Sequence, residues 1–292
     1  MVFIEISKSM RPQQWIKNFF IFAALIFSQN FLDFSLVLKT VQAFIIFCLL
    51  SGSLYILNDL KDLEEDKLHP IKSRRPLASS RLKKSSAILS FFGFSALGLL
   101  LAGSLNLNFL IIACVFFVIQ VAYSFYLKHV VILDVFIIAA SFFIRVVAGA
   151  LAIEVDISHW LLICTTLLAL FLAMSKRRHE LVLLEENAIN HRSILREYNP
   201  YLLDQMIAVV TASIVVAYCL YTVSEETVTK FGTTKLLYTV PFVLYGIFRY
   251  LYLVHQKSEG GSPEVLVIQD KPLLIDIFLW IVSVGIILYL IK

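Results

Sequence analysis

The residues best suited to chemistry lie in one short acidic stretch, from Asn58 to Asp66. On a helix, Asp59, Asp62 and Asp66 fall on one stripe, because successive side chains are about 100° apart. Three carboxylates on one face repel each other unless a cation lies between them. Proteins commonly hold Mg²⁺ with one or two carboxylates and the phosphates of a substrate. The stretch therefore predicts metal-assisted chemistry on a phosphorylated substrate; the simpler alternative is a solvated acidic helix end.

A basic run follows the acidic stretch, and Lys72 and Arg75 are its candidate substrate ligands. Arginine offers a bidentate fork and lysine a point charge, so both can neutralise phosphate oxygens that a metal leaves uncovered. Asn58 adds an amide beside the carboxylates. Taken alone, such a run is typical of the inner loop of a membrane protein. Its position next to the aspartates favours phosphate binding.

Two further segments place polar side chains at the ends of apolar runs. Before the first run, Trp15 suits an anchor at the membrane interface, and Lys17 either reaches a phosphate or anchors the chain as well. Asp134 stands among apolar neighbours, where a carboxylate is costly and by default functional. Its alternative role is that of a structural partner for Lys128.

Two more cationic features are candidate phosphate ligands. Arg145 lies inside an apolar segment and predicts either a phosphate ligand in a cavity or a partner for another helix. Pairing with Asp134, which is 11 residues away, is strained within one straight helix. Lys176 and Arg177 follow the sixth apolar segment, where basic runs usually mark the inner end of a helix.

Membrane-spanning helices must position these residues. Hydrophobic residues make up 59% of the 292, and charged residues only 16%, whereas soluble domains are about a quarter charged. Long apolar runs between charged loops predict an all-α polytopic membrane protein with a single domain, residues 1–292. The runs do not alternate as the strands of a barrel would. We expect nine spans, near residues 19–32, 41–57, 86–105, 109–127, 131–151, 159–175, 205–223, 236–254 and 273–291.

The distribution of positive charge predicts the orientation. With a cytoplasmic N-terminus, 20 of the 25 Lys and Arg residues lie in inner segments or, like Arg249, near the inner end of a span; 4 lie in outer segments, and Arg145 lies within a span. The acidic stretch then faces the cytoplasm. Segments 58–85 and 176–204 form cytoplasmic loops that cap the site. We therefore expect a multi-pass protein of the cell (inner or plasma) membrane.

Other functional classes find little support in the sequence. The four cysteines lie in apolar spans without CxxC spacing, which is typical of small core residues. No spacing of His, Cys and Glu indicates zinc. Basic charge alone does not predict nucleic-acid binding, because the membrane already explains it.

Several motifs resemble those of the UbiA superfamily of intramembrane prenyltransferases, whose fold of nine helices agrees with the expected spans. The motif similar to the first aspartate-rich motif is Asn58-Asp59-x-x-Asp62-x-x-x-Asp66. The segment from Tyr123 to Asp134 is similar to the second motif region. Gln120 departs from the pattern, because many members carry an aspartate there. This departure weakens any scheme in which two full aspartate-rich motifs hold metals symmetrically.

Within that superfamily, the chain resembles the decaprenyl-phosphate phosphoribosyltransferases. The motifs are Arg11-Pro12-x-Gln14-Trp15-x-Lys17-Asn18, Asp66-x-x-His69-Pro70-x-Lys72-x-x-Arg75-Pro76, Leu127-Lys128-His129-Val130-Val131-x-x-Asp134, Lys176-Arg177-Arg178-x-Glu180-Leu181 and Pro241-Phe242-Val243-x-Tyr245-Gly246-x-Phe248-Arg249-Tyr250. Together they cover nearly the whole chain.

The resemblance implies a Mg²⁺-dependent transfer of a 5-phosphoribosyl group from phosphoribosyl pyrophosphate to a polyprenyl phosphate, for lipid-linked arabinose and cell-envelope glycan synthesis. Asp59, Asp62 and Asp66 are the implied metal ligands, and Asp59, Asp62 and Asp134 the implied catalytic residues. The implied substrate-binding residues are Lys17, Asn18, Asn58, Lys72, Arg75, Tyr123, Lys128, Arg145, Lys176 and Arg177.

Two alternatives stay open at this point. A prenyltransferase of the same fold would move a prenyl chain from a prenyl diphosphate to an aromatic acceptor and would use the same aspartates. A transporter would use Asp134 and Arg145, but no clear internal repeat of the kind typical of transporters is present. A homo-oligomer is also left open.

Overall fold

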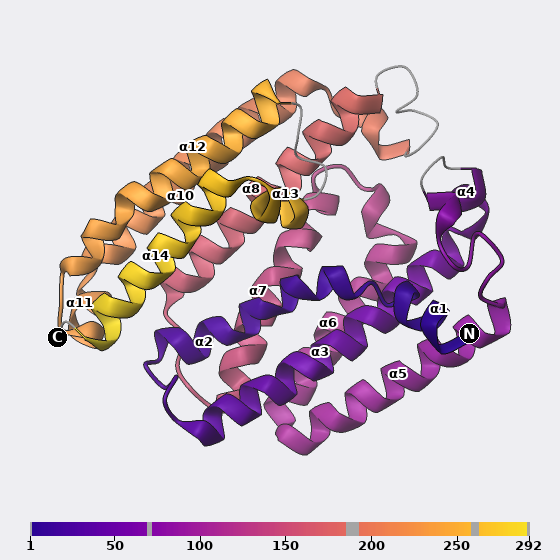
Figure 1. Ribbon diagram of the computed structural model, residues 1–292, viewed down its shortest axis with the longest axis horizontal. Coiled ribbons are helices and arrows are strands. Elements are labelled where there is room, and N and C mark those ends of the chain that lie inside the picture. Colours follow the sequence, from indigo (N-terminus) through magenta and orange to yellow (C-terminus); the bar gives the residue numbers. More distant parts are fainter. Residues whose placement is uncertain (1, 69–71, 185–192, 258–262, 291–292) are drawn as a thin grey trace. The chain divides into compact units, whose positions relative to one another are not determined.

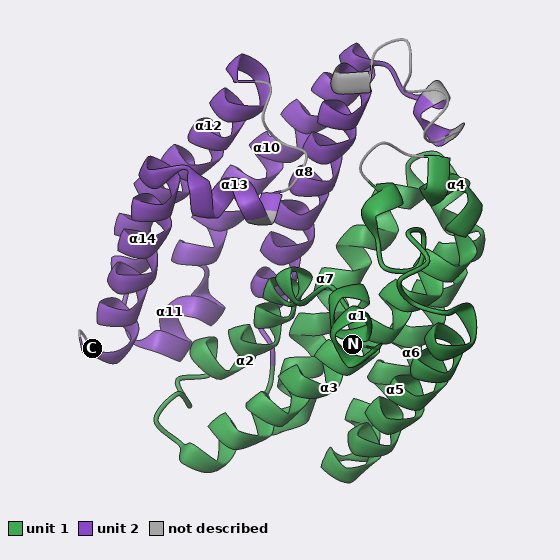
Figure 2. Cartoon of the chain, turned by 45° about the vertical axis from the view of Figure 1, so that its right-hand side comes forward, with its two compact units in different colours: residues 1–156 green, residues 157–292 purple. Residues whose placement is uncertain are grey.

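The computed structural model of the chain describes residues 2–68, 72–184, 193–257 and 263–290, and the secondary-structure elements in these ranges are helices (Figure 1). The chain divides into two compact units, Met1–Asp156 and Ile157–Lys292 (Figure 2). Within the described ranges, eight helices are long and apolar enough to cross a membrane. The chain is thus a multi-pass membrane protein, as its composition predicts.

The first unit is arranged around one long helix. Its elements are α1 (Val2–Ser9), η1 (Pro12–Ile21), α2 (Phe22–Phe27), α3 (Phe34–Lys61), α4 (Leu63–Leu68), η2 (Lys72–Arg74), α5 (Lys84–Leu105), α6 (Leu107–Phe125), η3 (Leu127–His129) and α7 (Leu133–Ile153). Helix α3 packs against α5, α6, α7 and η1. At the centre of this core, the ring of Phe47 lies 5.9 Å from that of Phe109 and 5.0 Å from that of Phe116. Such aromatic packing fixes α6 against α3.

The two ends of α3 are determined by aspartates. Asp33 caps its start, because its side chain accepts hydrogen bonds from the backbone N–H groups of Ser35 and Leu36. Asp62 ends α3, yet its own N–H still bonds to the carbonyl of Asn58 at 2.9 Å, and the N–H of Asp66 bonds to the carbonyl of Asp62 at 2.8 Å. The helical spacing therefore continues through the break into α4.

The first expected span, residues 19–32, is not one long α-helix. The ten-residue 3₁₀ helix η1 leads directly into the six-residue α2, and 3₁₀ runs of that length are uncommon. After Phe27 the chain turns, with the Asn30 amide donating to the Ser28 hydroxyl at 3.0 Å and Gln29 in a left-handed conformation. The other eight expected spans coincide, within a few residues, with the eight long helices.

Helix α7 approaches η1 very closely at Gly149. A Cβ atom at this position would lie 2.0 Å from the carbonyl oxygen of Ile21. No other residue type fits there without moving the backbone of one helix.

The second unit is a bundle of antiparallel helices. Its elements are α8 (His159–Leu184), η5 (Ser193–Glu197), α10 (Pro200–Val223), α11 (Glu225–Phe231), η6 (Lys235–Thr239), α12 (Val240–Gln256), α13 (Pro263–Gln269) and α14 (Lys271–Tyr289). Helix α10 packs against α8 and α12, and α14 packs against α12 and α13. Arg249 donates to both carboxylate oxygens of Asp270, at 3.0 and 2.7 Å, and so lowers the pKa of this carboxyl.

The two expected loops are more helical than the sequence suggests. Segment 58–85 contains the end of α3 and the short helices α4 and η2. Segment 176–204 is helical at both ends, because α8 continues to Leu184 and α10 begins at Pro200. The acidic residues of segment 58–85 are therefore held on or beside helices, whereas Arg75, Arg81 and Lys83 lie in the turns between η2 and α5.

Candidate active site

Seven polar residues of the first unit form what we call the acid–base cluster: Arg11, Asn58, Asp59, Asp62, Asp66, Arg75 and Lys128. The acids come from the end of α3 and from α4, and the bases come from three other segments. Six of the seven are site residues predicted from the sequence. Folding thus brings the acidic stretch and its predicted cations together.

Arg75 joins two of the aspartates. Its Nη1 atom donates to Asp59 Oδ1 at 3.1 Å and to Asp66 Oδ2 at 2.5 Å. Arg11 donates to the same Asp59 oxygen, while its guanidinium lies over the ring of Tyr55, 5.0 Å from the centroid. Two guanidinium groups therefore act as the cation that the acidic stripe requires.

Asp62 has a separate set of partners. Lys128 Nζ donates to its Oδ1 at 2.6 Å, and the Asn58 amide donates to its Oδ2 at 3.1 Å. Lys128 lies in η3, 66 residues from Asp62 in the chain. This pair ties the end of α6 to the end of α3 and makes Lys128 a partner of Asp62.

Burial differs between the two parts of the cluster. The side chains of Asp59 and Asp66 are each 3% exposed, whereas those of Arg11 and Arg75 are 27% and 24% exposed. In the other pair Asp62 is 20% exposed and Lys128 10%. An anion that approaches Asp59 and Asp66 from solvent therefore meets the two guanidinium groups before it meets these carboxylates. Guanidinium groups bind phosphate oxygens strongly and in a defined geometry.

The donor set was compared with what a divalent metal requires. Among the described residues, no three side chains of His, Cys, Asp or Glu gather closely enough to hold a metal ion. Two carboxylates do converge, because Asp59 and Asp66 contact one nitrogen of Arg75. A pair of oxygen donors fits Mg²⁺, which usually completes its coordination with water and substrate phosphates. The residues present therefore fit a metal that is bound together with a phosphorylated ligand.

Two residues at the cluster have a strained backbone. Arg11 has a φ of 52° and Ile132, between Lys128 and Asp134, has a φ of 67°. A left-handed conformation costs about 1–3 kcal/mol for residues other than glycine, and such residues concentrate at functional sites. For the β-branched Ile132 the conformation is especially unusual.

Arg145 belongs to a different polar group in the same unit. Its Nε donates to the Asn18 amide oxygen at 2.7 Å, its Nη1 to the Ser141 carbonyl at 2.6 Å, and its Nη2 lies 3.5 Å from the Ser51 hydroxyl. The rings of Phe116 and Phe142 lie 4.8 and 5.7 Å from the guanidinium. Of the two roles predicted for Arg145, pairing with another helix is thus observed, although through neutral groups.

The remaining predicted residues lie at several places. Lys17 lies in η1, Lys72 in η2 and Tyr123 in α6, and all three are half-buried. Asp134 lies in the first turn of α7 and is fully buried.

Lys176 and Arg177 belong to α8, in the second unit. Arg177 is buried and donates to Glu180 at 2.5 Å. His69, in the motif after the acidic stretch, lies outside the described residues.

The sequence reasoning missed two residues of interest. It gave Arg11 no partner, although this residue contacts Asp59 across 48 residues of sequence. The available signal was that Arg11 begins the motif Arg11-Pro12-x-Gln14-Trp15-x-Lys17-Asn18. It also passed over Asp276, which is 8% exposed within α14. The signal that identified Asp134, a carboxylate inside an apolar run, applies equally to Asp276.

Comparisons with known proteins agree on a family. The sequence profile described as the UbiA prenyltransferase family matches residues 18–282. A decaprenyl-phosphate phosphoribosyltransferase of Mycolicibacterium smegmatis is 31% identical, over 97% of this chain and 92% of the relative. One of Corynebacterium glutamicum is 29% identical, over 97% of this chain and 86% of the relative. Among solved structures, a UbiA homolog from Archaeoglobus fulgidus bound to GPP and Mg²⁺ has a TM-score of 0.73 at 17% identity, covering 97% of this chain and 99% of that one.

Proposed function

This chain belongs to the UbiA prenyltransferase family, and from that membership we propose that it transfers a 5-phosphoribosyl group from phosphoribosyl pyrophosphate to a polyprenyl phosphate. The observation that carries the proposal is the similarity, over nearly the full length of both chains, to enzymes named decaprenyl-phosphate phosphoribosyltransferase. The acid–base cluster supports it, because the partly exposed Arg11 and Arg75 in front of the buried Asp59 and Asp66 suit a diphosphate ligand.

The reaction joins the acceptor to the ribose and releases diphosphate. A phosphate oxygen of the polyprenyl phosphate forms a bond to the anomeric carbon as the bond from this carbon to the pyrophosphate oxygen breaks. The products are a polyprenyl-phosphoryl-5-phosphoribose and pyrophosphate. No general base is required, because the acceptor is a phosphate monoester that is largely ionised near neutral pH.

The cluster residues would divide this task. Arg75, Lys128 and the half-buried Lys17 and Lys72 would bind the phosphate oxygens of the donor. Mg²⁺, held by Asp59, Asp62 and Asp66 together with those phosphates, would supply positive charge to the departing diphosphate. Asn58 orients Asp62 through its amide.

The other predicted site residues keep roles in this proposal. Asn18, Tyr123 and Asp134 would line the acceptor side of the site, with Arg145 fixing Asn18 through their hydrogen bond at 2.7 Å. Asp134 would act in catalysis. We keep Lys176 and Arg177 as predicted substrate ligands.

We assign the protein to the cell (plasma) membrane, with its N-terminus and the acid–base cluster on the cytoplasmic side, where phosphoribosyl pyrophosphate is available. In this arrangement η1 and α2 would make a ninth crossing, and segments 58–85 and 176–204 would lie on the cytoplasmic side of the membrane. The product would serve lipid-linked arabinose and envelope glycan synthesis. Self-association into a homo-oligomer is compatible with this proposal.

The test is the incorporation of phosphoribose into lipid. Membranes that contain the protein are incubated with phosphoribosyl pyrophosphate labelled in the ribose, polyprenyl phosphate and Mg²⁺. We expect label in the organic phase, and loss of the signal with a chelator. Asp59→Asn should reduce the rate at least about 100-fold. Asp33→Asn is the matched control, because asparagine caps a helix as well as aspartate does.

The assay also separates this function from prenyl transfer. If the membranes leave phosphoribose in the aqueous phase but move a prenyl chain from a prenyl diphosphate to an aromatic acceptor, the proposed function is wrong. Equal transfer rates for Asp59→Asn and Asp33→Asn would contradict the catalytic role that we assign to the acid–base cluster.

A further inference from the structure

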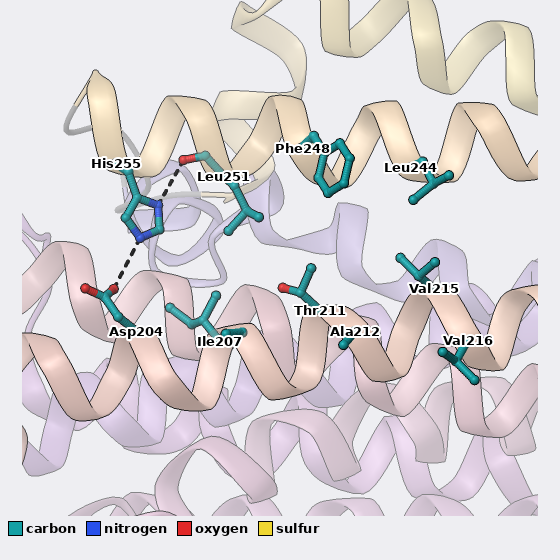
Figure 3. A pocket seen from close by; sticks show the side chains of 11 residues that line it. Asp204, Ile207, Thr211, Ala212, Val215, Val216, Leu244, Phe248, Leu251 and His255 are labelled. Carbon is teal, nitrogen blue, oxygen red and sulfur yellow. Dashed lines mark hydrogen bonds and ion pairs between the residues drawn. The ribbon is translucent and has the colours of Figure 1, made fainter.

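A groove runs along the second unit between α10 and α12 (Figure 3). Its volume is about 590 Å³, and apolar side chains from both helices line most of it. On α10, Ala208 and Ala212 lie one helical turn apart and leave room that larger side chains would fill. On α12, Phe248 lies opposite Thr211 and Ala212, and Leu244 lies opposite Val215 and Val216. Since both helices are long and apolar enough to span a membrane, hydrocarbon is the natural occupant of this groove.

The length of the groove matches one leaflet of a bilayer. It extends along α10 from Asp204 to Val216, which is about 18 Å of helix. Half of the hydrocarbon core of a bilayer is about 15 Å thick. Asp204 lies near the start of α10 and His255 near the end of α12, so the polar end of the groove lies at the headgroup level. The glycerol region of a lipid in that leaflet, together with the first part of one acyl chain, fits this length.

The polar end carries both signs of charge. Asp204 accepts hydrogen bonds from Arg178 Nε at 2.5 Å and Nη2 at 3.4 Å, and its Oδ1 lies 3.2 Å from His255 Nε2. A headgroup with a lone phosphate would be attracted by Arg178 and repelled by Asp204. A headgroup with a phosphate and an ammonium group complements both residues.

A buried hydroxyl lies part of the way along the groove. Thr211 is 9% exposed, and its Oγ1 atom has no hydrogen-bond partner among the described residues. Threonines in helices often bond to the carbonyl four residues earlier, as Thr166 does at 2.8 Å. An unpaired buried hydroxyl costs about 1–3 kcal/mol. The ester carbonyl of a glycerolipid would accept this hydrogen bond, whereas an isoprenoid chain offers no acceptor.

From these observations we propose that the groove binds one molecule of a zwitterionic glycerophospholipid of the phosphatidylethanolamine type. An ester carbonyl accepts a hydrogen bond from Thr211, the first part of one acyl chain fills the apolar groove beyond Thr211, and the headgroup contacts Arg178 and Asp204. The proposal goes beyond the transfer reaction and does not rest on it, because it is argued from residues of the second unit that have no role in the proposed reaction.

The test compares two equal substitutions on one helix. Val216 lines the groove and Val209 does not, and both are exposed side chains of α10, at 57% and 67%. The full-length protein is purified with dioleoyl phosphatidylethanolamine, and bound lipid is counted by native mass spectrometry. We expect Val216→Phe to reduce bound lipid about fivefold, and Val209→Phe to leave it unchanged. Ala212→Leu, which introduces a smaller side chain than phenylalanine into the groove, should also reduce the amount of bound lipid.

Two further comparisons test the contacts. Thr211→Val keeps the shape of the side chain and removes the hydroxyl, and we expect it to weaken lipid binding about fivefold. Phosphatidylglycerol and polyprenyl phosphate serve as competing lipids. The proposal is overturned if Val216→Phe and Val209→Phe retain lipid equally, if Thr211→Val has no effect, or if either competitor displaces phosphatidylethanolamine at equal concentration.

Discussion

At the scale of residues, the acid–base cluster is balanced in charge before any ligand binds. Asp59 and Asp66 face Arg11 and Arg75, and Asp62 faces Lys128. A diphosphate therefore cannot simply be added to the cluster. Its oxygens must replace carboxylates as partners of the cations, while the carboxylates gain the metal. Donor binding and metal binding should for this reason be coupled.

Lys128 is the residue at which this exchange is most easily measured. Lys128→Ala removes a donor to the phosphates and leaves Asp62 with only the Asn58 amide. Hydrogen bonds to charged groups contribute about 1.5–3 kcal/mol, so we expect KM for phosphoribosyl pyrophosphate to rise at least about tenfold. Steady-state kinetics would show it, with Lys39→Ala as the control. An unchanged KM would exclude contact between Lys128 and the donor.

Arg145 offers a choice between a structural and a substrate role. Arg145→Met keeps most of the volume but removes the donor at 2.7 Å from Asn18 Oδ1, which is left with the longer hydrogen bond from Ser51 at 3.4 Å. We expect a loss of about 1.5–3 kcal/mol in the free energy of unfolding, because the lost hydrogen bond is buried and comes from a charged group. The melting temperature in detergent measures this. Normal melting with lost turnover would instead indicate that Arg145 acts on a substrate.

At the scale of elements, the contact between α7 and η1 depends on a single glycine. Gly149→Ala would place a methyl group against the Ile21 carbonyl and push η1, with Asn18, away from Arg145. Overpacking costs about 1–3 kcal/mol, and more where backbone must move, so we expect Tm to fall by about 5 °C or more. Gly93 in α5 is the matched control, since nothing lies within 4 Å of an added Cβ there.

Gly93→Ala should keep or raise Tm, because alanine favours helix over glycine by about 1 kcal/mol. If both substitutions shift Tm equally, the close contact at Gly149 does not contribute to stability.

Hydropathy predicted the long helices well and the short ones poorly. An apolar run of about 20 residues has few alternatives to a helix in a membrane, so eight spans could be located from composition. The first expected span is not one long α-helix, because the chain turns at Ser28 through local hydrogen bonds that hydropathy does not detect. In the same way, the aspartates of the cluster were evident from their spacing. The contacts of Asp59 with Arg11 and of Asp62 with Lys128 join distant segments and could not be read from any local pattern.

At the scale of the whole molecule, the positive-inside pattern makes a prediction about topology. Lys230 and Lys257 are both exposed lysines of the second unit, at the ends of α11 and α12. In a background without native cysteines, Lys230→Cys should react with a membrane-impermeant maleimide in intact cells. Lys257→Cys should react only after permeabilisation. The reverse pattern would put the acid–base cluster on the side opposite to phosphoribosyl pyrophosphate and so contradict the proposed function.

All residues of the acid–base cluster lie within the first 128 positions of the chain. During synthesis they therefore all leave the ribosome before any residue of the second unit, which begins at Ile157, does so. Each buried aspartate can find its arginine or lysine while the later helices are still being translated. The carboxylates of the cluster therefore do not stay unpaired at the membrane until the second unit is made, a state that would be costly.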